Sequence, residues 1–374
     1  MPSCECLGFL EKASIQVKLM KWYPIKLTAA VREYAFAQRA IADRLGKKDV
    51  PPTGKIAETW EISGYKEAMG TVTNGALAGQ TLQQLTETHP DELVGEGWRG
   101  PHFPLLQKFI DATGMLPVHL HADDETAKRL HNAPNGKTEA WHILWAAPDA
   151  TVLAGLKSDF SREELFEAFV QQDYDAVMLR HPIQAGDTIY VPGCIIHAFG
   201  PDALVFEIQQ TSDLGQFVSP TNLYGEPLDE EKWHSNINAT LDELKNHYHP
   251  RPHAGLELQV GENSRIVGCA GPYFVLERWR LKENYLDPAH PHRCTTLSNV
   301  GDPVTLNFDG GSDRLERAQS CILPAAIGEV EIVPDSEASL VACYVPDLAQ
   351  DIIEPLRQAG YRDRQIQELG DVQL

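Results

Sequence analysis

Basic residues are scarce in this sequence, and long hydrophobic runs are absent from it. Among its 374 residues, 32 Lys and Arg stand against 53 Asp and Glu, so the formal net charge is −21 at pH 7. A chain this acidic lacks the excess of positive charge that binds a polyanion, so nucleic acids and anionic membrane surfaces are poor partners. No run of apolar residues approaches the ~18 that a membrane-spanning helix needs. The composition therefore argues against nucleic-acid-binding and membrane-spanning proteins.

Cysteine is also sparse, and an amino-terminal targeting pattern is missing. The seven cysteines are an odd number, scattered from Cys4 to Cys343. Such spacing is not that of a disulfide framework, so reduced thiols are expected. Residues 1–22 include Glu5 and Glu11, where a signal peptide would require an unbroken apolar stretch. We therefore expect a cytoplasmic protein that handles small molecules, and we assign no role to residues 1–22.

Short segments rich in β-branched and aromatic residues dominate the chain from residue 103 onward, with Gly, Pro and Asp between them. This pattern is typical of an antiparallel barrel or jelly roll. A helix is predicted after Ser161, because Ser161 and Glu164 form a capping-box pattern ahead of an apolar stripe. A second helix is expected over residues 229–245. A third, ending at Gly46, is indicated by the spacing of the apolar residues Val31, Tyr34, Ala35, Ile41 and Leu45.

These patterns divide the chain into five parts. We expect an N-terminal segment that packs on the first barrel (1–100), the core of that barrel (101–220), a helical connector (221–254), a second, smaller β-domain (255–346) and a C-terminal tail (347–374). The two strand-rich halves are the only indication of internal repetition.

The sharpest local signal is the pair His119 and His121 in the segment PVHLHADD. On a strand these two side chains point to the same face, ~7 Å apart along the backbone, so they can converge on one ion. Glu139 begins a later strand, and His197 lies in a turn followed by another strand. In a barrel such strands can be neighbours, with their inward residues meeting in the interior. Three imidazoles and one carboxylate fit a divalent ion such as zinc, manganese, iron or nickel. We expect Cys194 to be a small packing residue.

Several motifs in order resemble those of the type I mannose-6-phosphate isomerases, a zinc-dependent family of the cupin superfamily. They are IAETWEIS (56–63), NGALAGQTLQQL (74–85), FPLLQKFIDA (103–112), VHLHADDE (118–125), NGKTEAWHIL (135–144), AGDTIYVPGCIIHA (185–198), FEIQQTSD (206–213) and, in the second half, PYFVLERWRL. The resemblance covers about residues 24–345. It implies a mainly β fold, with a cupin jelly-roll catalytic barrel carrying helical insertions and a second, smaller cupin-like β-domain.

The resemblance also implies roles for particular residues. The metal ligands of the family fall on His119, His121, Glu139 and His197, around one divalent ion that is Zn²⁺ in the family. The first of these is usually glutamine there, so His119 is a departure. The positions that the resemblance gives to the substrate pocket are Lys108, Trp60, Gln209 and Asp213.

The activity implied is aldose–ketose isomerisation, which interconverts mannose 6-phosphate and fructose 6-phosphate through a cis-enediol. A base must move one proton between C2 and C1 of the sugar. Lys137 lies on the strand face of Glu139, but it would need a lowered pKa to act as a base. Glu207 is ionised at neutral pH without help. The sequence leaves both residues open as the base.

Two departures from the family pattern concern the phosphate. The family serine two positions before the first ligand is Pro117 here, and the segment SDLGQFVSPTNLYG, which begins at Ser212, contains no arginine. Lys108 and Lys137 remain as point charges, without the bidentate fork of an arginine.

The small-molecule partner is therefore a sugar or a sugar phosphate. An isomerase acting on an unphosphorylated sugar and a non-catalytic, metal-containing sugar-binding or sensing protein remain as alternatives. The motif series argues against an iron-dependent dioxygenase.

Overall fold

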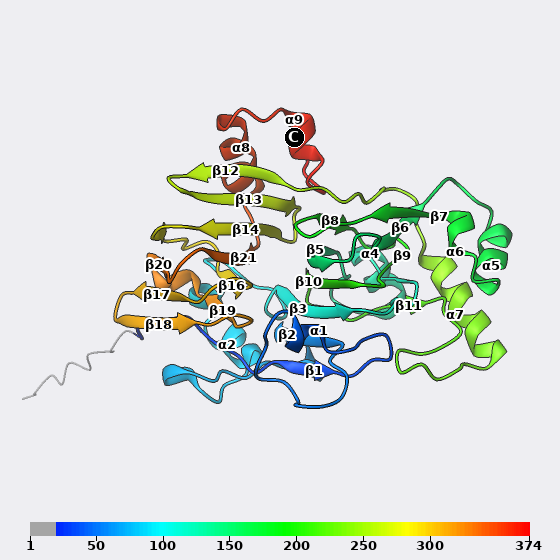
Figure 1. Ribbon diagram of the computed structural model, residues 1–374, viewed down its shortest axis with the longest axis horizontal. Helices are drawn as coiled ribbons and strands as arrows, with labels where there is room; N and C mark the ends of the chain where they lie inside the picture. Colours follow the sequence, from blue (N-terminus) through cyan, green and yellow to red (C-terminus); the bar gives the residue numbers. More distant parts are fainter. Residues whose placement is uncertain (1–19) are drawn as a thin grey trace, which may run out of the picture.

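The computed structural model describes residues 20–374, and it consists of two strand-rich halves that lie side by side (Figure 1). Each half has a six-stranded antiparallel sheet facing a smaller antiparallel sheet. The mainly β, cupin-type fold is therefore confirmed. The expectations that rest on Cys4, Glu5 and Glu11 lie outside the described residues.

The first barrel contains the strands that carry the predicted ligands. Its six-stranded sheet has the order β1-β2-β3-β10-β5-β8, and its five-stranded sheet has the order β11-β4-β9-β6-β7. The strand bounds are Ala30–Arg32 (β1), Glu58–Ile62 (β2), Leu105–Ala112 (β3), His119–Leu120 (β4), Glu139–Ala146 (β5), Thr151–Leu156 (β6), Met178–Pro182 (β7), Thr188–Val191 (β8), His197–Phe199 (β9), Ala203–Gln210 (β10) and Gln216–Phe217 (β11). Strands β1 and β2 belong to the predicted N-terminal segment, and the five-part division of the chain stays a prediction.

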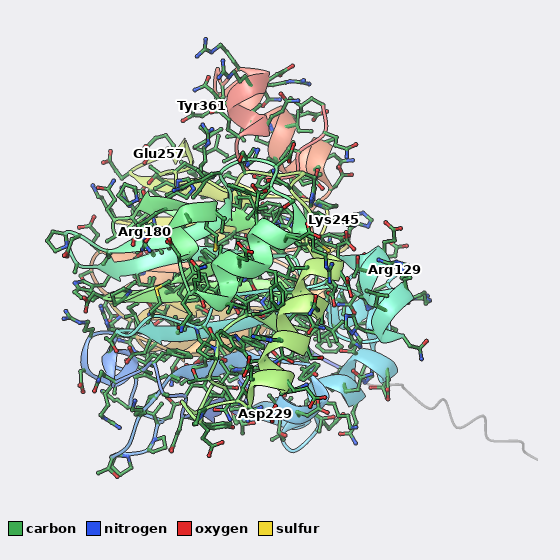
Figure 2. All side chains as sticks on the ribbon, turned by 90° about the vertical axis from the view of Figure 1, so that its right-hand side faces the viewer. Arg129, Arg180, Asp229, Lys245, Glu257 and Tyr361 are labelled. Atoms are coloured by element: carbon green, nitrogen blue, oxygen red, sulfur yellow. The ribbon has the colours of Figure 1, made fainter. Side chains whose placement is uncertain are left out.

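Seven α-helices precede the second barrel in the described part of the chain. They are α1 (Ala40–Asp43), α2 (Leu82–Thr88), α3 (Pro90–Leu93), α4 (Asp124–His131), α5 (Arg162–Val170), α6 (Tyr174–Val177) and α7 (Glu230–Glu243), with short 3-10 turns at Lys66–Ala68 and Gly75–Leu77. Helix α5 begins as predicted, because Ser161 accepts from the backbone of Glu164 and Glu164 accepts from the backbone of Ser161. The side chain of Asp229 caps α7 by accepting a hydrogen bond from the Lys232 amide at 2.8 Å, and Lys245 follows the other end of that helix (Figure 2).

The second barrel repeats the strand order of the first. Its sheets have the orders β12-β13-β14-β21-β16-β19 and β15-β20-β17-β18. The bounds are Leu256–Val260 (β12), Asn263–Ala270 (β13), Val275–Leu281 (β14), Tyr285–Asp287 (β15), Thr295–Asn299 (β16), Val304–Phe308 (β17), Gly311–Leu315 (β18), Ser320–Leu323 (β19), Val330–Pro334 (β20) and Ala338–Tyr344 (β21), with a 3-10 turn at Ala325–Ile327.

The C-terminal tail packs on the second barrel. It contains a π-helical segment (Leu348–Ile353), α8 (Glu354–Gln358) and α9 (Asp363–Gln367). The hydroxyl of Tyr361 accepts a hydrogen bond from the Glu257 amide at 3.0 Å and donates one to the Glu257 carbonyl at 3.0 Å (Figure 2). Apolar residues of the tail, among them Ile352 and Leu356, are buried against Val275 of β14. The tail therefore closes one face of this barrel.

The two six-stranded sheets share one hydrophobic core. Phe109 and Ile208 of the first barrel belong to the same buried cluster as Leu297 and Ile322 of the second. The Gln107 amide on β3 also donates a hydrogen bond to the Thr296 hydroxyl on β16. Burial of this common apolar surface joins the two halves.

The helix predicted to end at Gly46 is largely wrong. Val31 pairs with Thr59 in the β1–β2 ladder, so the segment begins as a strand. The carboxylate of buried Asp111 then accepts from the backbone amides of Gln38 at 3.3 Å and Ala40 at 2.5 Å. Only the four residues of α1 are α-helical. Strand pairing and the hydrogen bonds to Asp111 outweigh a helical preference that the apolar spacing alone indicated.

Five of the seven cysteines fall within the described residues, and all five are buried with free thiols, as predicted. Cys194 is one of them, and its Sγ accepts a hydrogen bond from the Asp123 amide at 3.3 Å. No helix within residues 20–374 has the length and apolar character that a membrane crossing requires.

Candidate metal centre and substrate pocket

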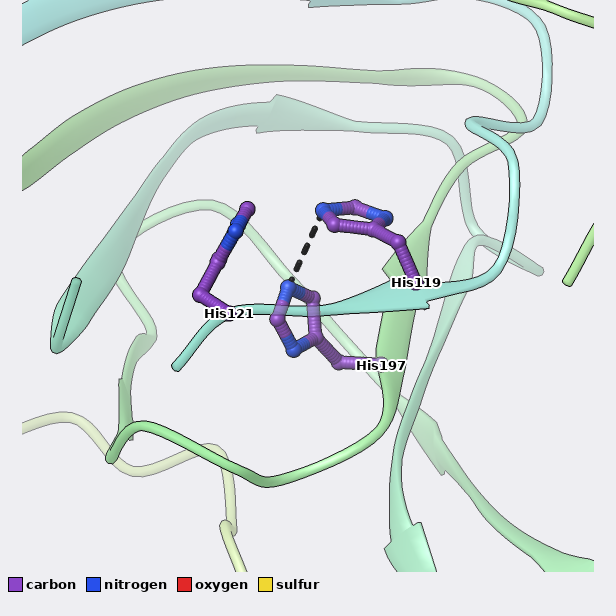
Figure 3. Close-up of side chains that lie close together, drawn as sticks. All are labelled: His119, His121 and His197. Atoms are coloured by element: carbon purple, nitrogen blue, oxygen red, sulfur yellow. Dashed lines mark hydrogen bonds between the residues drawn. The ribbon is translucent and has the colours of Figure 1, made fainter. Parts of the chain in front are cut away.

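Three histidines from neighbouring strands of the first barrel meet at one point (Figure 3). Antiparallel pairing of β4 with β9 places His119 directly opposite His197, and His121 follows β4 on the same face. One nitrogen of each ring lies within 4.8 Å of the other two, and all three side chains are buried. The same-face arrangement of His119 and His121 is as the strand alternation predicted.

The other nitrogen of each ring is fixed by the backbone. The Nδ1 atoms donate to the carbonyls of Pro117 at 2.7 Å, Leu214 at 2.6 Å and Ile195 at 2.8 Å, for His119, His121 and His197 respectively. A carbonyl oxygen can only accept, so each Nδ1 carries the hydrogen. In a neutral ring the Nε2 atom then carries a free lone pair, which is the state in which histidine binds a metal.

Burial keeps the rings of His119 and His121 neutral. It lowers the pKa of His119 well below its usual value, and the neighbouring His197 and His121 add to the effect. Burial, with the positive charge of Lys137, lowers the pKa of His121 to about 3. The Nε2 atoms of His119 and His197 nevertheless lie 3.1 Å apart. Two buried lone pairs at this distance have no proton between them, so the donor set fits a bound cation.

Glu139 lies beside two of the three imidazoles, at the start of β5. Its Oε1 is 3.2 Å from Nε2 of His197, and its Oε2 is 3.3 Å from Nε2 of His121. Burial opposes ionisation, but Lys137 and the two histidines together lower the pKa of Glu139 well below its usual range. Among residues 20–374, the group whose ligand atoms are all mutually close contains the three histidines alone. Glu139 borders that group, as an ionised carboxylate.

Two lysines and two further carboxylates adjoin the histidines. Lys137 Nζ lies 2.7 Å from Nε2 of His121 and 2.8 Å from Oε2 of Glu139. Lys108 Nζ lies 3.2 Å from Oε1 of Glu207 and 3.6 Å from Oε2 of Glu58, because Glu207 and Lys108 are opposite each other in the β10–β3 ladder. All of these side chains are almost fully buried.

The charges of this group perturb one another. Burial raises the pKa of Glu207, and Lys108 offsets part of that rise. Burial would lower the pKa of Lys108, but the carboxylates of Glu207 and Glu58 outweigh it and raise that pKa. Glu207 is therefore a carboxylate of raised basicity whose Oε1, although close to Lys108, has no well-directed hydrogen bond.

A cavity of about 120 Å³ opens onto this group. Its lining is Tyr34, Phe36, Glu58, Lys108, Ile110, Leu116, Pro117, His119, His121, Lys137, Phe199, Glu207, Asp213, Gly215, Phe217 and Leu223. Six of the residues singled out in the sequence therefore line it: Lys108, His119, His121, Lys137, Glu207 and Asp213. Asp213 is exposed at its mouth.

Four of the predicted site residues lie behind the cavity wall. Glu139 and His197 reach the metal group from there. Trp60 is 1% exposed, and Lys108 Nζ lies 4.3 Å from the centre of its ring. Gln209 is fully buried, and its amide donates to the carbonyl of Ser212 at 2.6 Å, which holds the turn that carries Asp213. Trp60 and Gln209 support lining residues instead of lining the cavity themselves.

Aromatic residues at the cavity were missed by the sequence analysis. Tyr34 and Phe36 form a tilted ring pair with centres 5.8 Å apart, and Phe217 stacks on His119 at 5.2 Å. The helix predicted for this segment hid the first pair. The spacing of Arg32 and Tyr34, two residues apart at the end of a strand, was a signal that could have revealed Tyr34, whereas Phe36 lies in a turn.

Both the sequence and the structure resemble those of known proteins. A family model described as the phosphomannose isomerase type I catalytic domain matches residues 25–141. The mannose-6-phosphate isomerase ManA of Bacillus subtilis is 35% identical over 233 residues, which are 62% of this chain and 71% of that protein. The crystal structure of the mannose 6-phosphate isomerase from Bacillus subtilis superposes with a TM-score of 0.76 at 26% identity, covering 86% of this chain and 99% of that one.

A structure of mannose 6-phosphate isomerase bound with zinc and yttrium has the same fold, with a TM-score of 0.65 at 14% identity over 86% of this chain and 99% of that chain. The fold, the matched catalytic-domain region and the identity to ManA all agree with the motifs read from the sequence. The chain therefore belongs to the type I phosphomannose isomerases, a family of aldose–ketose isomerases.

Proposed function

We propose that this protein interconverts mannose 6-phosphate and fructose 6-phosphate through a cis-enediol, with one divalent ion, Zn²⁺, as its cofactor. The observation that carries the proposal is the pair of facing Nε2 atoms of His119 and His197, 3.1 Å apart beside a cavity that also holds Glu207. The family membership and the names of the relatives support the sugar phosphate as substrate.

His119, His121 and His197 would hold the ion, with Glu139 as a fourth ligand. Nitrogen and carboxylate oxygen donors without a thiolate suit zinc, and a family member has been solved with zinc bound. When bound, the ion supplies positive charge that stabilises the negative charge developing on the sugar oxygens. The Nδ1 hydrogen bonds to the backbone fix the orientation of each ring, so the donors are arranged before any ion binds.

We assign the proton transfer to Glu207. Its carboxylate takes the proton from C2 of the aldose while the C1 carbonyl oxygen gains a proton, which gives the cis-enediol. Glu207 then returns its proton to C1 as the C2 hydroxyl loses one, which gives the ketose with no net change in protons. Burial raises the pKa of Glu207, and this makes it a stronger base than an exposed carboxylate.

Lys137 is the weaker candidate for the base. Its Nζ lies within 2.8 Å of two acceptors, His121 and Glu139, so it acts as a hydrogen-bond donor in this arrangement. It lies 4.0 Å from Oε1 of Glu207. We therefore give Lys137 the role of donating a proton or hydrogen bond to the substrate oxygens, next to the base.

The remaining predicted pocket residues have supporting roles in this proposal. Lys108 keeps Glu207 ionised, and Trp60 packs against the Lys108 ammonium. Gln209 holds the turn that carries Asp213 at the mouth of the cavity, where Asp213 can accept from sugar hydroxyls.

One observation favours an unphosphorylated sugar as the alternative substrate. Both lysines that line the cavity have carboxylate partners, at 2.8 Å for Lys137 and 3.2 Å for Lys108. Neither ammonium is thus free to neutralise a phosphate dianion. The site could then serve an isomerase of a neutral sugar, or a sugar-binding protein without catalysis.

The test compares phosphorylated and free sugar. Zinc-loaded protein is incubated with fructose 6-phosphate or with fructose, and the formation of mannose 6-phosphate or mannose is followed. We expect the wild-type protein to convert the phosphate ester. His121→Gln should lose this activity, and His292→Gln should retain it, because His292 is an exposed histidine outside the pocket. Turnover of free fructose alone supports the alternative isomerase. If the protein binds sugar but converts neither compound, the result supports a non-catalytic sugar-binding or sensing protein.

A further inference from the structure

The substrate in the proposed function carries a phosphate dianion, yet the inner cavity offers it little free positive charge. Lys108 lies between Glu207 and Glu58, and Lys137 lies against Glu139. The cavity also exposes the carboxylate of Asp213 at its mouth. A phosphate deep in this cavity would meet carboxylates in excess of free cations, so its binding position must lie toward the mouth.

Arg32 provides a cation next to that mouth: it does not line the cavity itself, but its charge acts on Asp213 and Tyr34, which do. It is the last residue of β1, and the β1–β2 register places it opposite Glu58, which lines the cavity. The centre of its guanidinium lies 5.1 Å from the centre of the Trp60 ring. The side chain is half-buried, and one terminal nitrogen donates to the carbonyl of Glu67 at 3.1 Å.

The guanidinium of Arg32 has N–H donors that no carboxylate occupies. Within the described part of the chain, no carboxylate lies within 4.0 Å of it. It therefore differs from Lys108 and Lys137, whose positive charges are neutralised by neighbouring carboxylates. An arginine carries five N–H donors in a planar fork that fits two phosphate oxygens at once.

The upper limit on the separation of Arg32 from Lys108 is close to the length of a hexose phosphate. The centre of the Trp60 ring is 5.1 Å from the Arg32 guanidinium and 4.3 Å from Lys108 Nζ, so these two cations are no more than about 9.4 Å apart. The seven bonds from C1 to phosphorus of a hexose 6-phosphate span roughly 8 Å when extended, at ~1.2 Å per bond. A sugar with its reacting carbons beside Glu207 can thus place its phosphate at Arg32.

Tyr34 adds an uncharged hydrogen-bond donor to the lining of the cavity. It follows Arg32 by two residues, just beyond the end of β1, and lines the cavity. Burial raises the pKa of Tyr34, and the charges of Glu58 and Asp213 raise it further. Its hydroxyl therefore stays protonated and can donate a hydrogen bond to an anionic oxygen.

We propose that Arg32, assisted by the hydroxyl of Tyr34, binds the phosphate group of the substrate at the mouth of the cavity and so gives the enzyme its preference for phosphorylated sugars. This inference rests on the proposed function, because it assumes a phosphorylated substrate. It assigns the phosphate to strand β1, and not to the segment after Ser212, which contains no arginine.

The test measures the preference for phosphate in Arg32→Gln. We expect kcat/KM for mannose 6-phosphate to fall roughly 10–100-fold, mainly through KM, because a charge-assisted contact is lost. The value for mannose should stay unchanged. Arg32→Lys should recover part of the loss, since it keeps the charge without the fork. Arg44→Gln is the matched control, because Arg44 also stacks on a tryptophan, 3.6 Å from the centre of the Trp145 ring. Neither arginine lines the cavity, but Arg32 is opposite the lining residue Glu58 in the β1–β2 ladder, whereas Arg44 caps the end of α1.

A binding measurement gives a second readout that does not depend on turnover. Calorimetry with glucitol 6-phosphate and with glucitol compares ligands that cannot isomerise. We expect the wild-type protein to bind the phosphate ester more tightly, and Arg32→Gln to lose most of that difference. A variant that keeps the full difference overturns the role of Arg32. A variant that weakens both ligands equally makes the residue structural, and this also overturns the proposal.

The wild-type result separates this inference from the proposed function. If wild-type protein turns over mannose 6-phosphate and prefers glucitol 6-phosphate, the proposed function stands whatever Arg32→Gln does. If wild-type protein turns over only the free sugar and shows no preference for the phosphate ester, the proposed substrate and the role of Arg32 both fail.

Discussion

The Nε2 atoms of His119 and His197 face each other across the β4–β9 pair, 3.1 Å apart, while the Nδ1 atom of each ring donates to a backbone carbonyl two residues before it. The backbone therefore fixes which nitrogen is free, and strand pairing fixes where it lies. A buried arrangement that brings bare lone pairs together stores repulsion until a cation relieves it. The chemistry of the pocket follows from this relationship.

Lys137 competes with the metal for the same ligands. Its ammonium lies 2.7 Å from Nε2 of His121, so a divalent ion must displace it or bind against its charge. Two unit charges ~4 Å apart repel by about 4 kcal/mol at an effective dielectric constant near 20. We expect Lys137→Met to bind zinc at least tenfold more tightly while losing isomerase activity, as measured by competition with a coloured chelator. Lys157→Met, at an exposed site, should leave zinc affinity unchanged. Weaker zinc binding in Lys137→Met would contradict this account.

Glu207 should control the rate and not the binding of substrate. Replacing it by Gln keeps the shape but removes the base, so kcat should fall ~10²–10⁴-fold. KM should change little, and zinc should still bind one ion per chain. Release of deuterium from C2-labelled mannose 6-phosphate into solvent should fall in parallel with kcat.

The control for this variant is Glu277→Gln, which changes another buried carboxylate, on β14 of the second barrel, that pairs with Arg265 at 2.6 Å and does not line the cavity. It should retain wild-type kcat. If Glu207→Gln keeps an activity within a few-fold of wild type, another residue must transfer the proton. Lys137 would then be the next candidate.

Acid should destabilise the fold through buried histidines, and His142 reports this without touching the pocket. Burial, with the nearby charge of Arg278, lowers the pKa of His142 to about 3. The unfolded chain, with a pKa near 6.5, therefore binds a proton between about pH 6.5 and 3 that the native chain does not. Stability falls as pH falls through this window, by about 2 kcal/mol from pH 7 to pH 5 at this residue alone.

The measurement is urea unfolding at pH 7 and pH 5. The loss of unfolding free energy between the two should be about 2 kcal/mol smaller in His142→Gln than in wild type. His292→Gln, at a side chain 78% exposed, should lose as much as wild type. An equal loss in His142→Gln and wild type would show that His142 is protonated in the native state.

The sequence predicted most clearly what depends on local pattern. The same-face pair of His119 and His121 follows from strand alternation, and the start of α5 follows from the capping box of Ser161 and Glu164. The barrel class followed from many short strands. The meeting of His197 with His119 needed more, since it depends on the pairing of β4 with β9, which only the barrel topology and the resemblance indicated.

The sequence failed where long-range contacts decide the local structure. The segment around Tyr34 has helical spacing, yet pairing with β2 and hydrogen bonds to Asp111 make its first part extended. This error concealed the place of Arg32 and Tyr34 beside the cavity. The ion pair between Lys108 and Glu207 could not be predicted from the sequence either, because the register of β3 with β10 brings together residues 99 positions apart.

The central claim is that one divalent ion held by the three histidines is required for isomerisation. Zinc is removed with a chelator and then titrated back, while bound zinc and the rate of mannose 6-phosphate formation from fructose 6-phosphate are measured on the same samples. We predict negligible activity without metal and a rate that rises in proportion to bound zinc until one ion is bound per chain. Full activity in metal-free protein, or zinc binding of the same affinity in His121→Gln, would contradict the claim.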